Sequence, residues 1–100
     1  MALTPSFVLF SAQAAIAASL PVTIPFSGDY YFAVNGAFGG CTVALEILGP
    51  DGTNYINCGT SATLTAAGTA IVTLPKGAKV RANLTGGAAM SIYAELKGVN

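Results

Sequence analysis

Four carboxylates are the residues of this chain that come closest to a catalytic set. They are Asp29, Glu46, Asp51 and Glu95. A glycosidase needs two carboxyl groups facing one cleft, but Asp51 belongs to a Gly-Pro-Asp-Gly turn and the others lie at the start or on the outward positions of predicted strands. The chain has no histidine and two cysteines, so it lacks Ser-His and Cys-His pairs and the common zinc sites. We therefore expect that the protein is not an enzyme and that it binds neither a metal nor a cofactor.

The two cysteines fall on the two arms of one predicted hairpin. If the turn pairs Leu48 with Thr53, then Val43 faces Cys58 and Cys41 lies diagonally across on the same face. A diagonal pair is near the outer limit for a disulfide. We expect free thiols that pack as small apolar side chains. A disulfide is the alternative if a bulge shifts the register by two residues.

A small basic group lies near the end of the sequence. It consists of Lys76, Lys79 and Arg81, with Lys97 as a fourth candidate. One interpretation is a solvated strand face, and the other is contact with an acidic surface of a partner.

Charge is scarce in this sequence. Four Lys/Arg balance four Asp/Glu over 100 residues, so the formal net charge is zero and charged residues make up 8%, against about 25% in ordinary soluble domains. The length fits one domain, and the balance excludes a basic nucleic-acid-binding arm. An electroneutral surface favours association, so we expect much of it to be covered in an assembly.

From residue 29 onward the pattern is that of short antiparallel strands. Apolar and polar residues alternate with period two between turns rich in Gly, Pro, Asn and Asp. The turns include residues 35–36 and 49–52. The predicted strands are 29–34, 41–48, 54–58, 61–66, 69–74, 78–84 and 90–97. Their spacing of about ten residues predicts an all-β, antiparallel β-sandwich or barrel domain over residues 25–100.

Residues 1–24 differ from this body and are expected to form an apolar N-terminal arm. No positively charged segment precedes the apolar run, as a secretory signal requires, and prolines 5 and 21 bracket too few apolar residues for a membrane span. Residues 12–18 are expected to be extended or to form one or two helical turns. The arm is expected to bury five apolar side chains against a partner: Phe7, Leu9, Phe10, Ile16 and Leu20.

Two segments carry a family resemblance. FGGCTVALEILGPDGTNY (38–55) and LTAAGTAIVTLPKGAKVRANLTGG (64–87) resemble small head proteins of tailed bacteriophages of the capsid decoration, or cement, type. The resemblance spans residues 25–99 and implies a jelly-roll-like sandwich on the outer capsid surface of the virion, made in the host cytoplasm. It implies binding to the major capsid protein and to neighbouring copies as a homo-oligomer, with no nucleic acid and no membrane. It supplies no catalytic residues.

Two other functions remain open from the sequence. The first is a receptor- or glycan-binding module of a phage tail or fibre, which needs a groove with convergent side chains such as Tyr55, Asn57 and Tyr93. The second is a pilin-like or secreted subunit that donates its apolar segment as a strand. A disulfide between the two cysteines would favour this second function, because disulfides persist in oxidising compartments.

Overall fold

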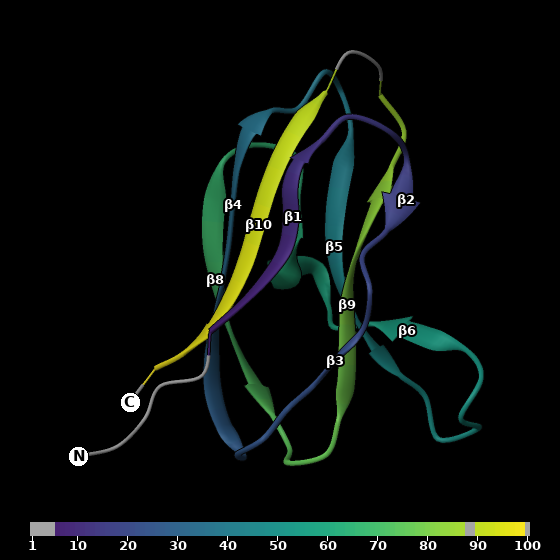
Figure 1. The fold of residues 1–100 in the computed structure, drawn as a ribbon, viewed down its shortest axis with the longest axis vertical. Helices are drawn as coiled ribbons and strands as arrows, with labels where there is room; N and C mark the ends of the chain where they lie inside the picture. The colour runs from purple at the N-terminus through teal and green to yellow at the C-terminus, as the bar shows by residue number, and fades with distance from the viewer. Residues whose placement is uncertain (1–5, 88–89, 100) are drawn as a thin grey trace.

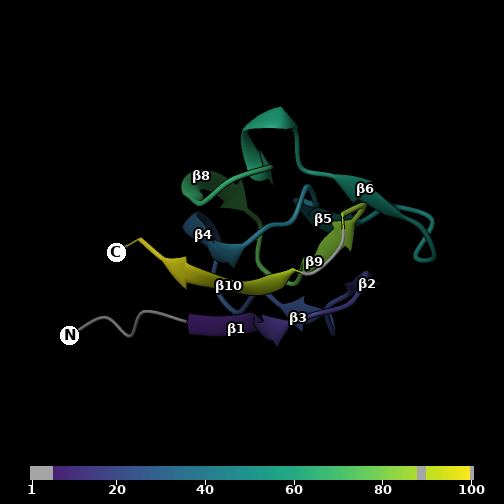
Figure 2. The same cartoon turned by 90° about the horizontal axis from the view of Figure 1, so that it is seen from above.

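The chain folds as two antiparallel β-sheets packed face to face (Figures 1 and 2). The computed structural model describes residues 6–87 and 90–99. The predicted all-β sandwich is therefore confirmed. The first five residues of the expected arm, and residues 88, 89 and 100 of the expected sandwich domain, lie outside the described residues.

Sheet A has four strands and sheet B has six. The order in sheet A is β1 (Ser6–Gln13), β10 (Ser91–Gly98), β4 (Gly28–Ala37) and β8 (Gly68–Leu74). The main path of sheet B is β2 (Ala17–Ala18), β9 (Lys79–Thr85), β5 (Thr42–Leu48) and β6 (Tyr55–Asn57). Two further strands complete it: β3 (Val22–Thr23) pairs with β9, and β7 (Thr63–Leu64) pairs with β5.

The core lies between the sheets and follows the predicted alternation. Successive side chains of a strand point to opposite faces, and the expected inward positions of β4, β5, β9 and β10 are buried, with Ile47 partly buried at the end of β5. The inward positions that are buried, including Cys41 and Met90 directly before β5 and β10, are Tyr30, Phe32, Val34, Cys41, Val43, Leu45, Val80, Ala82, Leu84, Met90, Ile92, Ala94 and Leu96.

The prediction of a turn at residues 35–36 is wrong. Strand β4 continues to Ala37, and the turn comes later, where the amide of Cys41 donates to the carbonyl of Phe38 at 2.9 Å. Gly36 pairs with Ile92 inside the ladder, and its φ is 119°. A Cβ at this position would collide with the carbonyl oxygen of Ser91. Glycine is needed at this position because the two strands approach each other closely. A glycine in a strand can therefore mark a close approach of two backbones instead of a turn.

The turn at residues 49–52 is confirmed, with a different register from the one predicted. The amide of Gly52 donates to the carbonyl of Gly49 at 3.0 Å. Leu48 pairs with Tyr55 instead of Thr53, which moves the returning strand two residues further from the register that a disulfide needs, so that it is now four residues away from it. Both cysteines are free, as expected.

The strand predicted at residues 61–66 is mostly replaced by two short elements. A 3-10 helix, η1 (Thr60–Ala62), precedes β7. Because β6 pairs with residues 46–48 of β5 and β7 with residues 43–44, the chain must turn between two short pairings along the same strand. The buried side chain of Ala62 fixes this turn to the core.

The N-terminal segment is extended and belongs to both sheets. Strand β1 lies beside β10 at one edge of sheet A, and β2 and β3 pair with β9 of sheet B (Figure 1). Two register shifts in β1 and the positive φ of Ala12 (52°) bend the chain from one sheet to the other.

This arrangement corrects the expected arm. The side chains of Leu9 and Phe10 are only 8% and 4% exposed and pack in the protein's own core. They are not available to a partner, because the inward positions of β1 close the edge of the sandwich.

Removing one of these inward side chains should therefore destabilise the whole domain. We expect Phe10→Ala to cost about 3–5 kcal/mol, as for a buried aromatic side chain. Leu20→Ala should stay within about 0.5 kcal/mol, since its side chain is exposed. Urea unfolding measures both values, and equal stability of the two variants would show that β1 contributes nothing to the core.

Candidate functional site

Several outward side chains of the N-terminal segment are large, apolar and exposed. Of nine large hydrophobic residues exposed in the described chain, four fall within residues 8–26. We call these four the N-terminal rim: Val8, Ile16, Leu20 and Phe26. Strands β1, β3 and β2 run along one side of the sandwich in the view from above (Figure 2). Val8 is on β1, and Ile16, Leu20 and Phe26 lie in the connections before β2, between β2 and β3, and after β3.

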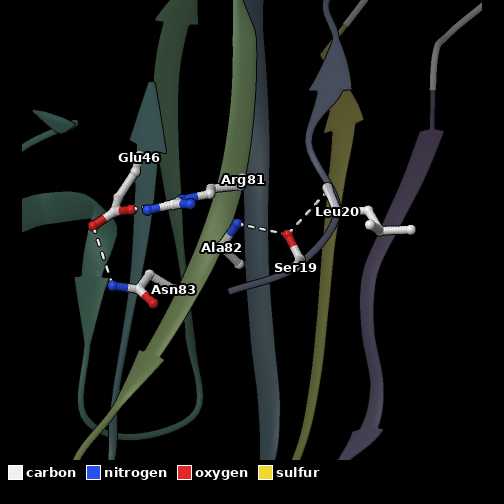
Figure 3. Close-up of polar contacts among 6 residues, drawn as sticks. All are labelled: Ser19, Leu20, Glu46, Arg81, Ala82 and Asn83. Atoms are coloured by element: carbon white, nitrogen blue, oxygen red, sulfur yellow. Dashed lines mark hydrogen bonds and ion pairs between the residues drawn. The ribbon is translucent and has the colours of Figure 1, made fainter. Parts of the chain in front are cut away.

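Ser19 fixes the backbone between Ile16 and Leu20 to strand β9. Its amide donates to the carbonyl of Ala82 at 2.8 Å, and its Oγ accepts from the amide of Ala82 at 2.9 Å (Figure 3). The same hydroxyl lies 3.3 Å from the carbonyl oxygen of Leu20, to which it donates. Ser19 is buried, whereas the neighbouring Leu20 is 86% exposed. The side chain thus completes the β9 ladder between β2 and β3, and the backbone at Leu20 is fixed without burying its apolar side chain.

The predicted basic group is divided by the fold. Arg81 lies on the outer face of sheet B, where its Nε donates to Oε1 of Glu46 at 2.9 Å and its guanidinium stacks 4.0 Å from the centre of the Tyr55 ring. Asn83 donates to the second oxygen of Glu46 at 3.3 Å (Figure 3). The charge of Arg81 is therefore balanced within the chain.

The three lysines of that group do not lie together. Lys76 is in the turn before β9 and Lys79 begins β9, both exposed. Lys97 lies on sheet A, where its Nζ is 3.4 Å from Oε1 of Glu95. Lys79 lies on the same face of β9 as Arg81, two residues away, whereas Lys97 is on the other sheet.

A shallow hollow of about 730 Å³ opens on the outer face of sheet A. Its floor includes the small side chain of Ala33, and Tyr31 and Tyr93 are among the residues that line it. Ala33 pairs with Glu95, and the two tyrosines occupy the flanking rows on β4 and β10, about 14 Å apart by strand geometry. Both rings are partly exposed. The volume falls in the range of small-ligand sites.

Each of the four carboxylates contacts a group close to it in the fold. Besides the two ion pairs described above, Oδ1 of Asp29 accepts from the Thr73 hydroxyl at 2.6 Å. Asp51 accepts from the amides of Thr53 and Asn54, which lowers the pKa of its carboxyl group. Each carboxylate thus has a local partner that explains its position.

The cysteine thiols are separate and weakly acidic. The amide of Cys58 donates to the carbonyl of Leu45 at 2.9 Å, so Cys41 is four residues further along β5, about 13 Å away. Burial raises the pKa of both thiols, and the nearby charge of Glu46 raises the pKa of Cys58 further. Both thiols are free, so there is no Cys41–Cys58 disulfide to favour the secreted-subunit alternative.

No group of three or more His, Cys, Asp or Glu side chains is arranged to hold a metal ion within residues 6–87 and 90–99. In the same residues, no helix has the length and apolar character to cross a membrane.

The structure sorts the five predicted partner residues into two groups. Leu9 and Phe10 are in the core, and Phe7 packs against it with partial exposure. Ile16 and Leu20 are 58% and 86% exposed and belong to the rim. Sequence reasoning treated the segment as one apolar surface and so did not separate inward from outward positions.

The glycan-binding set proposed from the sequence is not brought together. Tyr55 and Asn57 are on β6 of sheet B, whereas Tyr93 is on sheet A. The Oδ1 of Asn57 is occupied by the amide of Gly59 at 2.8 Å and the hydroxyl of Thr63. The hollow beside Tyr93 uses Tyr31 instead, which period-two alternation in β4 could have identified as an outward residue.

Comparison with protein families and with curated proteins finds no match to this chain.

The thiol environments predict a difference in reactivity. In the native protein we expect one thiol, that of Cys58, to react with a disulfide reagent such as DTNB, and more slowly than a free cysteine because its raised pKa leaves less thiolate. Cys41, which is fully buried, should react only after unfolding. Cys58→Ser should abolish the native reaction. Two equally fast native thiols, or none after unfolding, would contradict these environments.

Proposed function

We propose that this protein is a virion structural subunit of the capsid decoration type, which binds and stabilises an assembled phage head. The observation that carries the proposal is the N-terminal rim, where apolar side chains are exposed on a backbone fixed to both sheets. The family resemblance of residues 25–99 gives the partner class, the major capsid protein, and the outer capsid surface as the location, with synthesis in the host cytoplasm. The jelly-roll-like variant of the sandwich is part of the same proposal.

The energetics support a surface that is covered by a partner. Val8 and Leu20 are 69% and 86% exposed, and complete burial of one such side chain contributes roughly 1.5–3 kcal/mol. Burying the four rim residues would give several kcal/mol on this basis, before the costs of association. Because the backbone at Ser19 is already fixed by two hydrogen bonds to Ala82, little additional backbone order is needed on binding.

Stabilisation would follow from mass action. A protein that binds the assembled lattice but not the separate subunits shifts the equilibrium toward the lattice. Many equivalent copies on one particle multiply this effect. No catalytic group or cofactor takes part in this mechanism.

Acidic substitutions on the rim test the proposal. Ile16→Asp combined with Leu20→Asp should lower binding to particles assembled from the candidate major capsid protein by at least about tenfold, equivalent to 1.4 kcal/mol. Cosedimentation over a range of concentrations measures the loss. The matched control is Ile56→Asp, because Ile56 is similarly exposed (53%) but lies on β6 at the opposite edge of sheet B.

Both substitutions fall on exposed side chains, so folding should be preserved and is checked by circular dichroism. If the rim variant saturates the particles like the unsubstituted protein, or if the unsubstituted protein does not bind assembled particles, the proposal is wrong.

The hollow on sheet A supports a second candidate, binding of a receptor glycan. Two partly exposed tyrosine rings, Tyr31 and Tyr93, line it, and polar groups are supplied by Glu95 in the row between them and by Asn35 opposite Tyr93. Aromatic rings provide apolar faces with polar edges, a combination that suits sugar rings.

A glycan array and titration of its best oligosaccharide test this second candidate. Tyr93→Ala should abolish binding, whereas Tyr55→Ala, on the other sheet, should leave it unchanged. Equal binding by the Tyr93 variant and the unsubstituted protein would exclude the hollow as the site.

A further inference from the structure

Strand β8 is an edge strand of sheet A, and the 3-10 helix η1 lies against it. It is the last strand in the order β1-β10-β4-β8, and it pairs with β4 over seven consecutive residue pairs without a register shift. Its sequence, GTAIVTL, has no charged residue and no proline. A regular, uncharged edge strand presents unpaired backbone groups and is a template for another strand.

The other edges of the described sheets are irregular or short. Strand β1 contains two register shifts. At the edges of sheet B, β2 and β3 have two residues each and β6 has three. Natural proteins use these same features to prevent pairing between edges, so β8 is the exception in this fold.

The order of side chains in β8 indicates what the additional strand is. Residues 69–73 read Thr-Ala-Ile-Val-Thr, which is nearly the same in both directions about Ile71. Antiparallel pairing of two identical strands around a twofold axis at residue 71 places each residue opposite the one at the same distance on the other side of 71 in the partner, and here each of these pairs joins side chains of the same polarity. We propose that β8 pairs antiparallel with β8 of a second copy, with Ile71 on the twofold axis, so that sheet A becomes one eight-stranded sheet.

This register matches side chains on both faces. On the outer face, Ile71 meets the partner's Ile71, and Thr69 meets the partner's Thr73. On the inner face, Ala70 meets the partner's Val72. Pairs of β-branched residues and of threonines are favourable cross-strand neighbours. Ile71 is 55% exposed in the single chain and Val72 is partly exposed, so both have apolar surface that pairing would cover.

The outer face around the axis is continuous and free of charge conflict. Tyr31 is the neighbour of Ile71 on β4, so the two copies would form a row of Tyr31, Ile71 and their partner equivalents. The charged residue nearest to β8 is Asp29, paired with Thr73. The two copies of Asp29 would lie about 14 Å apart across three strand spacings and further along the strands, which exceeds the screening length of about 8 Å at physiological salt.

The contact between copies does not depend on capsid binding, although it gives the proposed lattice a specific self-contact. It is tested in the purified protein alone, so its failure is distinguishable from a failure of the rim to bind particles.

Cysteine cross-linking tests the register. In a Cys58→Ser background, Ile71→Cys should give covalent dimers under mild oxidation, because opposite residues on paired strands are within disulfide range. Thr69→Cys is the matched control: two copies of residue 69 would be four residues apart, about 13 Å, and should remain monomeric on a denaturing gel. Equal cross-linking of both variants would overturn the register.

Sedimentation velocity tests the contact itself. The unsubstituted 10.0 kDa chain should form a particle of twice that mass at high concentration. Ile71→Lys should shift it to the monomer, because two ammonium groups would meet at the axis. Val8→Lys, at the opposite edge of the same sheet, should leave the dimer intact. A monomeric unsubstituted protein at every concentration, or open-ended oligomers in place of a dimer, would overturn the proposal.

Discussion

The fold depends on one segment that pairs with both sheets. Residues 6–13 complete the edge of sheet A, and residues 17–23 then run along β9 of sheet B. Ile24 ends the segment in the core, where its amide and carbonyl bond to the turn before β9 at 2.8 Å each. Because the same backbone is fixed at both sheets, the alternation of its side chains decides at once which residues stabilise the domain and which face outward.

The small number of charged residues makes the outward apolar side chains of this segment important for the proposed function. The described charges are largely occupied by local contacts: Asp51 orders a turn, Glu46 holds Arg81, and Glu95 lies beside Lys97. Outside these contacts, the surface is built mainly from neutral and apolar side chains. Strand β1, which carries Val8 of the N-terminal rim, and β8 are the two opposite edges of sheet A, so one copy has two distinct surfaces suited to different neighbours in an assembly.

Local alternation was sufficient to predict most of the core. In β9 and β10, each inward residue was identified because polar and apolar positions alternate without interruption. The Asn35-Gly36 pair misled because a glycine that allows close approach has the same signature as a turn glycine. The role of Ser19 could not be predicted, because its partner Ala82 is 63 residues away in the chain. Leu9 and Phe10 were misassigned because an uninterrupted apolar segment does not reveal which side of it meets the core.

Amide hydrogen exchange of the native protein tests most directly whether the N-terminal segment is an integral part of the sandwich. Amides that open only on global unfolding share the same exchange free energy. The hydrogen-bonded amides of β1 should exchange with the same free energy as those of β10, to which β1 is paired. If β1 exchanges as fast as an unstructured peptide while β10 remains protected, the segment is a separable arm and the distinction between core and rim residues is wrong.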